Sequence, residues 1–346
     1  MTEISGQKSE ISRGSPLHTL FFVVLLFGAL LLTLCVSAQA QQTGKVFRIG
    51  FLDSSTASGS AGLVDAFRQE LSKLGWMEGK NIAIEYRFAE QKPERVPELA
   101  AELIRLNVNL IVVTGTPPAL AAKSATSTIP IVMTNSGDPV GAGLVASLAR
   151  PGGNVTGLSG LNPQLNTKRM EVLKDVVPKL SRVGLLLGSR GGIADDLQLK
   201  ELRAAAQAMK LQLEEIKTQV DSEALQSAFQ SAKQKQVGAI MTTASRTFLG
   251  ERKRIVALAG KHRLPAIYFQ KEFVDEGGLM SYGTDYDDLY RRAAVYVDKI
   301  LKGAKPAELP VQQATKFEFV INLKAAKQIG LTIPPNVLAR ADKVVR

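Results

Sequence analysis

Strand-like and helix-like patterns alternate along this chain from residue 46 to residue 301, and this alternation sharply restricts the folds that it can adopt. Apolar runs rich in β-branched residues, such as 110–113, have strand length and predict buried parallel strands. The stretches between them carry apolar residues at helical spacing. Because strands that alternate with helices of this length form parallel sheets through right-handed crossovers, we expect an α/β protein.

The alternating series occurs twice, which predicts two similar Rossmann-like lobes. The first series ends near a proline- and glycine-rich break at 151–154, and the second begins near residue 165. The segments 155–159 and 281–285 are expected to cross between the lobes and to form a hinge. We expect strands at 46–52, 81–88, 110–114, 129–133, 182–187, 211–217, 238–243, 264–269 and 279–282, and helices at 60–74, 93–106, 165–177, 194–209, 221–235, 249–262 and 287–301.

The charge of the chain is strongly basic, with a formal net charge of +11 over 346 residues. The basic residues are scattered, and the clusters at 252–254, 261–263 and 291–292 lie on or beside helix-like stretches that also carry acidic or apolar residues. No nucleic-acid motif and no interleaving of basic with aromatic residues is visible. We therefore expect solvated helix faces and no nucleic-acid partner.

The first 40 residues have the pattern of a cleavable signal peptide. Lys8 and Arg13 precede an apolar run at 20–36, and an A-x-A pattern ends at Ala40. The alternative is an uncleaved membrane anchor, since the run approaches spanning length. The only cysteine, Cys35, lies in this run after a leucine rather than a small residue, so we do not expect lipid attachment; neither a disulfide nor a cysteine metal site can form.

The chain offers little material for catalysis. Of its two histidines, His18 lies in the leader and His262 lies at an expected helix end, so a histidine triad or a conventional zinc site is not expected. Adjacent aspartates, such as Asp195 and Asp196, fall at helix starts, where capping explains them better than acid–base chemistry. We expect no catalytic residues, no metal and no cofactor.

The loops after two successive strands, 114–117 and 134–139, supply hydroxyls, amides and backbone N–H groups without a nucleophile–base pair. Ligands of open α/β sheets bind just beyond the carboxyl ends of the strands. These loops therefore indicate a site that holds a small molecule without transforming it. A small-solute enzyme that uses a carboxylate or a lysine as its base, and a ligand-sensing module, are the alternatives.

Several long segments resemble the tryptophan/tyrosine-type substrate-binding proteins of bacterial ABC transporters. The resemblance extends from about residue 46 to residue 346 and is carried by LGWMEGKNIAIEYR (74–87), TIPIV (128–132), DPV (138–140), LARPGGNVTGLS (148–159), RLPAIY (263–268), GGLMSYG (277–283) and PVQQATKFEFVINLK (310–324). It implies a type I periplasmic binding protein fold, with residues 46–157 and 284–305 in one lobe and 158–283 and 306–346 in the other.

The resemblance also implies a function in amino acid transport. A protein of this kind captures a small solute, such as an aromatic amino acid, in a hinged cleft, and it docks in the periplasm on a membrane permease driven by a cytoplasmic ATPase. The membrane would then be contacted only through the permease or through an uncleaved leader. Two loops that would face the cleft depart from the family pattern, at 53–56 and 188–192.

The expected ligand site combines these strand-end loops. Hydroxyls after the first and third strands would bind a polar or anionic end of the solute, and Asp138 would face a ligand ammonium group, although an Asp-Pro turn explains Asp138 slightly better. Tyr268 and Tyr282 would form an aromatic wall, unless they pack in the core. The expected ligand-binding residues are Ser54, Ser55, Thr114, Gly115, Thr116, Asn135, Asp138, Ser159, Tyr268 and Tyr282.

Overall fold

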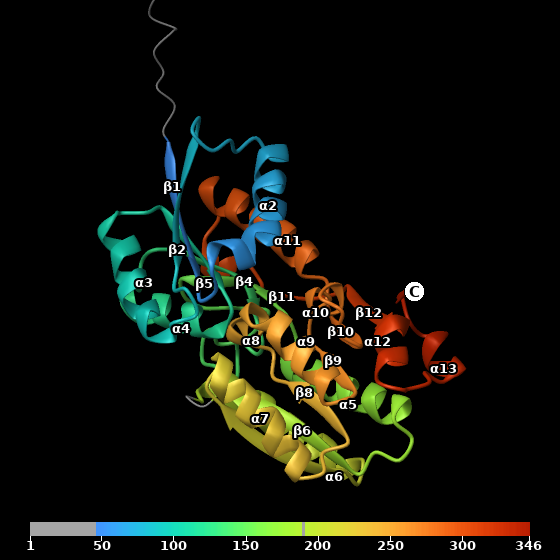
Figure 1. Cartoon of the computed structure of the whole chain (residues 1–346). Coiled ribbons are helices and arrows are strands. Elements are labelled where there is room, and N and C mark those ends of the chain that lie inside the picture. Colours follow the sequence, from blue (N-terminus) through green and yellow to red (C-terminus); the bar gives the residue numbers. More distant parts are fainter. Residues whose placement is uncertain (1–45, 189–190) are drawn as a thin grey trace, which may run out of the picture. The chain divides into compact units, whose positions relative to one another are not determined.

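The computed structural model describes residues 46–188 and 191–346, which form an α/β unit with two β-sheets (Figure 1). The expected signal peptide at 1–40 and Cys35 lie outside the described residues, as do two residues of the loop 188–192. None of the helices in the described ranges is long and apolar enough to cross a membrane.

The first sheet has six strands in the order β11-β5-β4-β3-β1-β2, and every neighbouring pair is parallel. The expected strands of the first series are present, and a short sixth strand joins them from the C-terminal part of the chain. The strands are β1 (Phe47–Asp53), β2 (Ile82–Phe88), β3 (Leu110–Thr114), β4 (Ile131–Ser136), β5 (Val155–Ser159) and β11 (Gln312–Gln313).

The second sheet has seven strands in the order β13-β12-β10-β9-β8-β6-β7. Only the pairing of β10 with β12 is antiparallel. The strands are β6 (Arg182–Gly188), β7 (Gln212–Thr218), β8 (Ala239–Thr242), β9 (Ala266–Tyr268), β10 (Met280–Thr284), β12 (Phe317–Asn322) and β13 (Lys343–Val345).

The helices cover both faces of each sheet. The expected helices are present, except that the one expected at 249–262 divides in two, and the ten-residue helix at 116–125 was not expected. The helices are α2 (Ala57–Lys73), α3 (Val96–Arg105), α4 (Thr116–Ala125), α5 (Asn162–Val176), α6 (Ile193–Ala208), α7 (Ser222–Gln234), α8 (Arg246–Gly250), α9 (Arg252–Lys261), α10 (Glu272–Asp275), α11 (Tyr286–Leu301), α12 (Leu323–Gln328), α13 (Pro335–Leu338) and the 3-10 turns η2 (Pro93–Arg95) and η3 (Pro306–Glu308).

Strand β3 shows why the sheets are buried on both faces. Leu110 and Val112 pack in the cluster formed with α2 and α11, whereas Ile111 and Val113 pack in the cluster formed with α3 and α4. Successive strand residues point to opposite faces, so a continuous apolar run satisfies both layers of helices. The second sheet is packed in the same way by two further clusters, one with α5 and α6 and one with α7 and α9.

The two sheets repeat one strand order, β2-β1-β3-β4-β5 in the first and β7-β6-β8-β9-β10 in the second. In each sheet the order reverses beside its first strand, between β1 and β3 and between β6 and β8. Open sheets of this order bind ligands outside the carboxyl ends of the strands at this reversal. The fold therefore places two ligand-binding edges in one unit, one from each sheet.

Three short segments connect the two sheets. The chain leaves the first sheet after Ser159, returns after Thr284 and leaves again after Gln313. The segments lie side by side: the Thr284 hydroxyl donates to the Gly160 carbonyl at 2.9 Å, and the Asp285 N–H donates to the Lys316 carbonyl at 3.0 Å.

Strand pairing differs from the expected lobe boundaries at two points. Strand β5 stays in the first sheet up to Ser159, and β11 pairs with β5, so the segment 306–313 belongs with the first sheet rather than the second. We propose that residues 46–159 and 286–313 form one lobe and that 162–284 and 317–346 form the other. The two-residue strand β11 gives no periodicity from which the sequence could have placed it.

Candidate functional site

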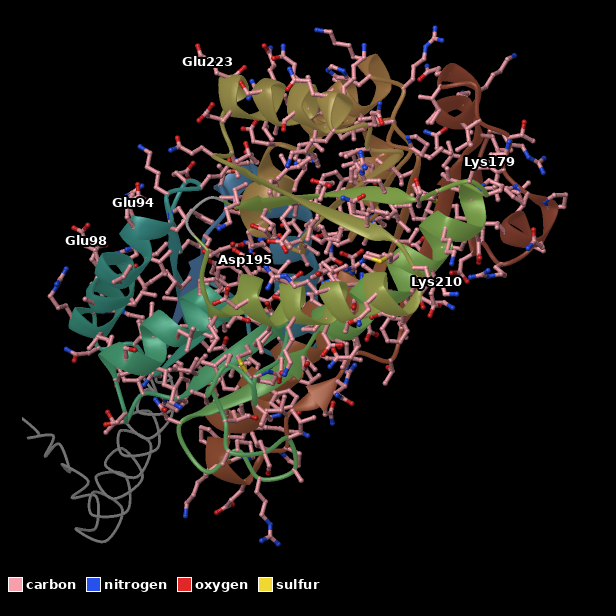
Figure 2. All side chains as sticks on the ribbon, turned by 90° about the horizontal axis from the view of Figure 1, so that it is seen from below. Glu94, Glu98, Lys179, Asp195, Lys210 and Glu223 are labelled. Carbon is pink, nitrogen blue, oxygen red and sulfur yellow. The ribbon has the colours of Figure 1, made fainter. Side chains whose placement is uncertain are left out.

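A cavity of about 480 Å³ lies at the carboxyl ends of the strands and takes its lining from both lobes. The first lobe contributes residues that follow β1, β2, β3 and β4, and the second lobe contributes residues that follow β6, β7, β8 and β9. Helix α6, at whose start Figure 2 labels Asp195, is among the elements from the second lobe. The cavity is thus located where both sheets present their binding edges.

Much of the cavity wall is apolar, and it includes two aromatic rings. Phe269 follows β9 directly, and Tyr286 begins α11. Apolar walls with a few polar groups are typical of small-molecule sites. The remaining apolar lining residues are Pro93, Pro117, Pro118, Leu120, Pro163, Ile193, Leu197 and Val220.

Six of the ten expected ligand-binding residues line this cavity: Ser54, Thr114, Gly115, Thr116, Asn135 and Asp138. They come from the ends of β1, β3 and β4, as expected from parallel strands whose carboxyl ends share one edge. Gly115 has a φ of +89°, a conformation that favours glycine and lets the chain turn from β3 directly into α4.

The threonine hydroxyls in this set already have partners. Thr114 Oγ1 lies 3.0 Å from the Tyr290 hydroxyl, and Thr116 Oγ1 lies 3.0 Å from Ser136 Oγ. Asp138 both lines the cavity and closes a turn, because its Oδ1 accepts the Gly141 N–H at 2.8 Å. The expected Asp-Pro turn and the expected place at the cavity are therefore both observed.

The other four expected residues do not line the cavity. Ser55 is fully buried, and the Ser159 hydroxyl donates to the Gly137 carbonyl at 3.4 Å. Tyr268 is buried and stacks on Phe273, with 4.5 Å between the ring centroids. Tyr282 packs against the apolar cluster between α5 and the second sheet. The structure thus puts Tyr268 in the core and packs the half-buried Tyr282 against a core cluster, so core packing, the alternative to an aromatic wall, is what both show.

The aromatic ring at the cavity belongs to the neighbour of Tyr268. Both Tyr268 and Phe269 contact Phe273, but only Phe269, the residue just after β9, is among the residues that line the cavity. The position at the end of a strand indicated that an aromatic residue would lie at the cavity, but it did not distinguish Tyr268 from Phe269. Sequence reasoning also missed Gln91, Asn162, Asp195, Gln198, Asp221, Arg246, Gln270 and Tyr286 as lining residues.

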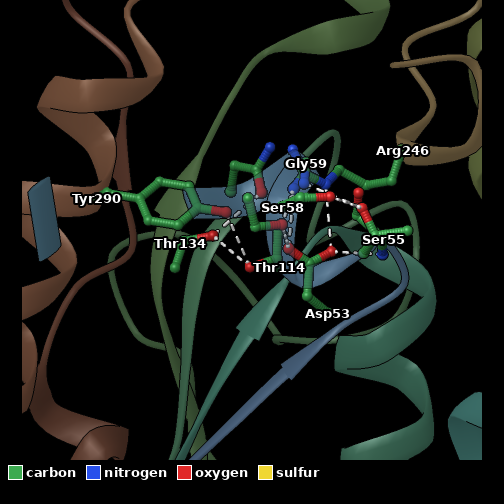
Figure 3. Close-up of polar contacts among 11 residues, drawn as sticks. Asp53, Ser55, Ser58, Gly59, Thr114, Thr134, Arg246 and Tyr290 are labelled. Atoms are coloured by element: carbon green, nitrogen blue, oxygen red, sulfur yellow. Dashed lines mark hydrogen bonds and ion pairs between the residues drawn. The ribbon is translucent and has the colours of Figure 1, made fainter. Parts of the chain in front are cut away.

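A buried ion pair joins the two lobes beside the cavity (Figure 3). Asp53, the last residue of β1, has a fully buried side chain, and Arg246, the first residue of α8, is 11% exposed. Arg246 Nη2 lies 2.8 Å and Nε 3.2 Å from the two oxygens of Asp53. The Ser55 N–H and the Ser60 hydroxyl also donate to Asp53, at 2.9 and 2.7 Å.

The ion pair accounts for Asp53, the acidic residue in the loop 53–56 that departs from the family pattern. Burial acts to lower the pKa of Arg246, but the Asp53 carboxylate, together with Tyr290 and Tyr286, holds that pKa above its ordinary value. The guanidinium therefore stays charged while it is buried. The acidic loop after the first strand has its counter-charge in the other lobe.

Several groups of the site lack bonds that burial normally demands. Gln270 is 3% exposed and lines the cavity, and neither its amide oxygen nor its amide nitrogen has a partner. Arg246 Nη1 is also without a partner. Buried polar atoms normally form hydrogen bonds, so these atoms are candidates for hydrogen bonds to a ligand or to water. Within residues 46–188 and 191–346, no group of three or more His, Cys, Asp or Glu side chains could hold a metal ion.

Comparison with known proteins places these features in context. The family model described as ABC transporter substrate binding protein matches residues 56–345. A tyrosine-binding protein of Clostridioides difficile is 27% identical over 266 residues, which are 77% of this chain and 75% of that protein.

Two solved structures have a closely similar fold. A conserved domain protein of Vibrio cholerae is 32% identical with a TM-score of 0.80, and the match covers 87% of this chain and all of the other. A crystal structure of an ABC domain of Streptococcus pneumonia in complex with L-Trp is 28% identical with a TM-score of 0.79, with the same coverage. These matches confirm the two-lobed α/β fold expected from the sequence.

Proposed function

Because the chain belongs to the ABC transporter substrate-binding protein family, we propose that it is the extracytoplasmic solute-binding component of an ABC importer. Its fold is that of the type I periplasmic binding proteins. One observation carries the proposal furthest: a single cavity receives its walls from the strand ends of both lobes. Such a cavity binds a solute between the lobes when they close and releases it when they separate.

The proposed ligand is an aromatic amino acid. Relatives in the comparisons include a tyrosine-binding protein and a domain in complex with L-Trp. In this chain Phe269 and Tyr286 supply ring surfaces beside the proline-rich wall, and aromatic pairs gain stabilisation beyond the area that they bury. A cavity of about 480 Å³ is within the range of small-molecule sites.

The polar end of the ligand would meet the first lobe. Ser54, Thr114, Gly115, Thr116 and Asn135 line the cavity there with hydroxyl, amide and backbone groups. These groups fit hydrogen bonds to a carboxylate or another polar group of the solute. The six expected residues that line the cavity remain our proposed ligand contacts. The other four do not line it, so we propose no ligand contact for Ser55, Ser159, Tyr268 or Tyr282.

Capture would proceed by closure about the three connecting segments. A ligand that contacts both lobes binds the closed form better, and it shifts the open–closed equilibrium by that difference in affinity. The Asp53–Arg246 pair joins the same two lobes and would stabilise the closed form with the ligand. The closed protein would deliver its solute to a membrane permease driven by an ATPase.

The proposed location is the periplasm, reached through the signal peptide at residues 1–40. Under this proposal the protein is not an enzyme, binds no nucleic acid and touches the membrane only through the permease or an uncleaved leader. The basic surplus of +11 lies on the exported part, since Glu3 and Glu10 balance Lys8 and Arg13 in the leader.

A thermal-shift screen of the purified protein against amino acids, nucleobases and sugars tests this function. We expect L-tyrosine or L-tryptophan to raise the melting temperature, because a ligand that binds only the folded state stabilises it by mass action. Chromatography of the mixture should recover the compound unchanged. Stabilisation by sugars alone would refute the proposed ligand class, and consumption of the compound would refute a pure binding role.

A further inference from the structure

The lining of the cavity is acidic, although the chain as a whole is basic. Among the described lining residues the charged ones are Asp138, Asp195, Asp221 and Arg246. Three carboxylates thus face one guanidinium, in a protein whose formal net charge is +11. Negative charge in the cavity of a protein with a positive net charge indicates that the solute carries a positive group.

Asp53 already balances the charge of Arg246, the one cationic side chain among the described lining residues. Arg246 donates through Nε and Nη2 to Asp53, and Nη2 also donates to the Ser60 hydroxyl at 2.7 Å. A bidentate pair of this kind satisfies the charge of the guanidinium. Among the described lining residues, a phosphate or a dicarboxylate would therefore meet only the unpaired Nη1 of an arginine whose charge is already balanced by Asp53, and it would face three carboxylates.

Two of the three carboxylates already accept hydrogen bonds from backbone N–H groups. Asp138 Oδ1 accepts the Gly141 N–H at 2.8 Å. Asp221 is exposed and caps α7, because its Oδ1 accepts the N–H groups of Glu223 and Ala224 at 3.0 and 2.9 Å. Their geometry is explained by the turn that Asp138 closes and by the helix start that Asp221 caps.

Asp195 is different from both. It lies half-buried in the first turn of α6, and it forms no ion pair with any described Lys, Arg or His. Its carboxylate faces inward, where a Cβ added to Gly188 at the end of β6 would lie 3.8 Å from Oδ2. Asp195 is not needed to stabilise the helix dipole, because the exposed Asp196 places a carboxylate in the same turn.

Gln270 gives a second and independent indication of a polar ligand group. Its side chain lines the same cavity, is 3% exposed and leaves both the amide oxygen and the amide nitrogen without a partner. An unpaired amide in a buried site costs free energy that a ligand hydrogen bond would recover. An amide can accept from an ammonium and donate to a carboxylate at the same time.

We propose that Asp195 is the counter-charge for a primary ammonium group of the solute and that Gln270 completes its hydrogen bonding. The site then selects amines, as zwitterions or as cations, and rejects solutes that carry only negative charge. This inference rests on the proposed function only in requiring that the cavity binds a small solute. It replaces Asp138, the residue expected from the sequence, as the ammonium partner.

The ionisation behaviour of Asp195 agrees with this role. Burial raises its pKa above the usual 3.8, while the nearby Thr243 hydroxyl acts in the opposite direction and Asp196 adds to the increase. A carboxylate that is costly to keep charged in the empty site gains most from a cation placed beside it.

Matched variants test the inference by titration calorimetry. Asp195→Asn keeps the size of the side chain and removes its charge, and Asp196→Asn removes an equal charge from the same helical turn outside the cavity. We expect Asp195→Asn to weaken binding of L-tyrosine by about tenfold to a hundredfold, as for a lost hydrogen bond to a charged group. Asp196→Asn should bind as the wild type does. Equal affinity of Asp195→Asn and wild type would overturn the inference while the proposed function stands.

A panel of probes separates the two proposals. It contains L-tyrosine, tyramine, 3-(4-hydroxyphenyl)propionate, putrescine, glucose and inorganic phosphate, and melting temperature is the readout. Stabilisation by the amines, but not by the deaminated acid, supports the inference. If putrescine alone stabilises the protein, the inference stands and the aromatic ligand class fails. If the deaminated acid, glucose or phosphate stabilises the protein as well as any amine, or if no probe does, the inference is refuted.

Discussion

Arg246 Nη2 lies 2.8 Å from Asp53 Oδ2, and this ion pair connects residues that are 193 positions apart and belong to different lobes. Asp53 ends the first strand of one sheet, and Arg246 follows the third strand of the other. Each residue lies at the reversal of strand order in its own sheet. The contact therefore couples the two binding edges directly, next to the cavity that they line.

Loss of either charge should destabilise the protein. Arg246→Met leaves the Asp53 carboxylate buried without a counter-charge, and removal of one partner from a buried pair costs about 3–5 kcal/mol. We expect the free energy of unfolding, measured by urea denaturation, to fall by about that amount. A wild-type value for Arg246→Met would show that the pair is not formed in solution.

The double variant Asp53→Asn with Arg246→Met provides the control for this effect. It removes both charges, so no uncompensated ion remains in the interior. We expect it to be more stable than Arg246→Met alone, which separates loss of the ion pair from loss of packing. Additive losses in the double variant would contradict a direct coupling of the two residues.

Substitution of the adjacent residues Tyr268 and Phe269 should have different effects on ligand affinity. Phe269→Ala removes a ring from the cavity wall and should weaken L-tyrosine binding by about tenfold, measured by calorimetry. Tyr268→Phe removes a buried hydroxyl that has no partner, so it should leave affinity unchanged and alter the free energy of unfolding by no more than about 1 kcal/mol. Weaker binding by Tyr268→Phe would mean that this hydroxyl reaches the ligand.

Trp76 should contribute to stability without affecting the ligand. Its indole N–H donates to Asp298 Oδ1 at 2.9 Å, and its ring meets Phe47 edge-on at 5.6 Å, away from the cavity lining. We expect Trp76→Phe to lower the free energy of unfolding by about 1–3 kcal/mol and to keep wild-type affinity. Since Trp76 is the only tryptophan of the chain, this variant also allows bound L-tryptophan to be followed by its own fluorescence.

The affinity for an amine ligand should fall in mildly acidic solution. The ammonium requires ionised Asp195, and burial raises the pKa of that carboxyl above 3.8, so protonation of the empty site begins at a higher pH than for an exposed aspartate. Calorimetry between neutral pH and the acid limit of stability should show affinity decreasing as the pH falls. Asp195→Asn should remove this part of the pH dependence, and an unchanged profile in the variant would assign it to another group.

Local patterns were sufficient to predict most of the fold. Runs such as 110–114 are apolar on both faces because helices cover both faces of the sheet, so their sequence alone marks them as buried strands. Helix α4 was missed because its first residues, Thr116 with Pro117 and Pro118, were interpreted as a loop; proline is well tolerated in a first turn. The elements after residue 301 are short and gave no clear periodicity.

The site was predicted on one lobe and largely missed on the other. Ser54, Thr114 and Asn135 were recognisable because they lie at or just after the ends of the buried strands β1, β3 and β4. Arg246 and Asp195 begin helices of the second lobe, where an isolated charge has many ordinary explanations. Only the tertiary structure shows that Arg246 meets Asp53 and that Asp195 has no such partner among the described residues.

Equilibrium dialysis with radiolabelled L-tyrosine or L-tryptophan tests the central claim most directly. The predicted result is saturable binding of one molecule per chain, with all of the label recovered as the unaltered amino acid after denaturation of the protein. Failure of both amino acids to bind, or recovery of the label in a different compound, would contradict the account.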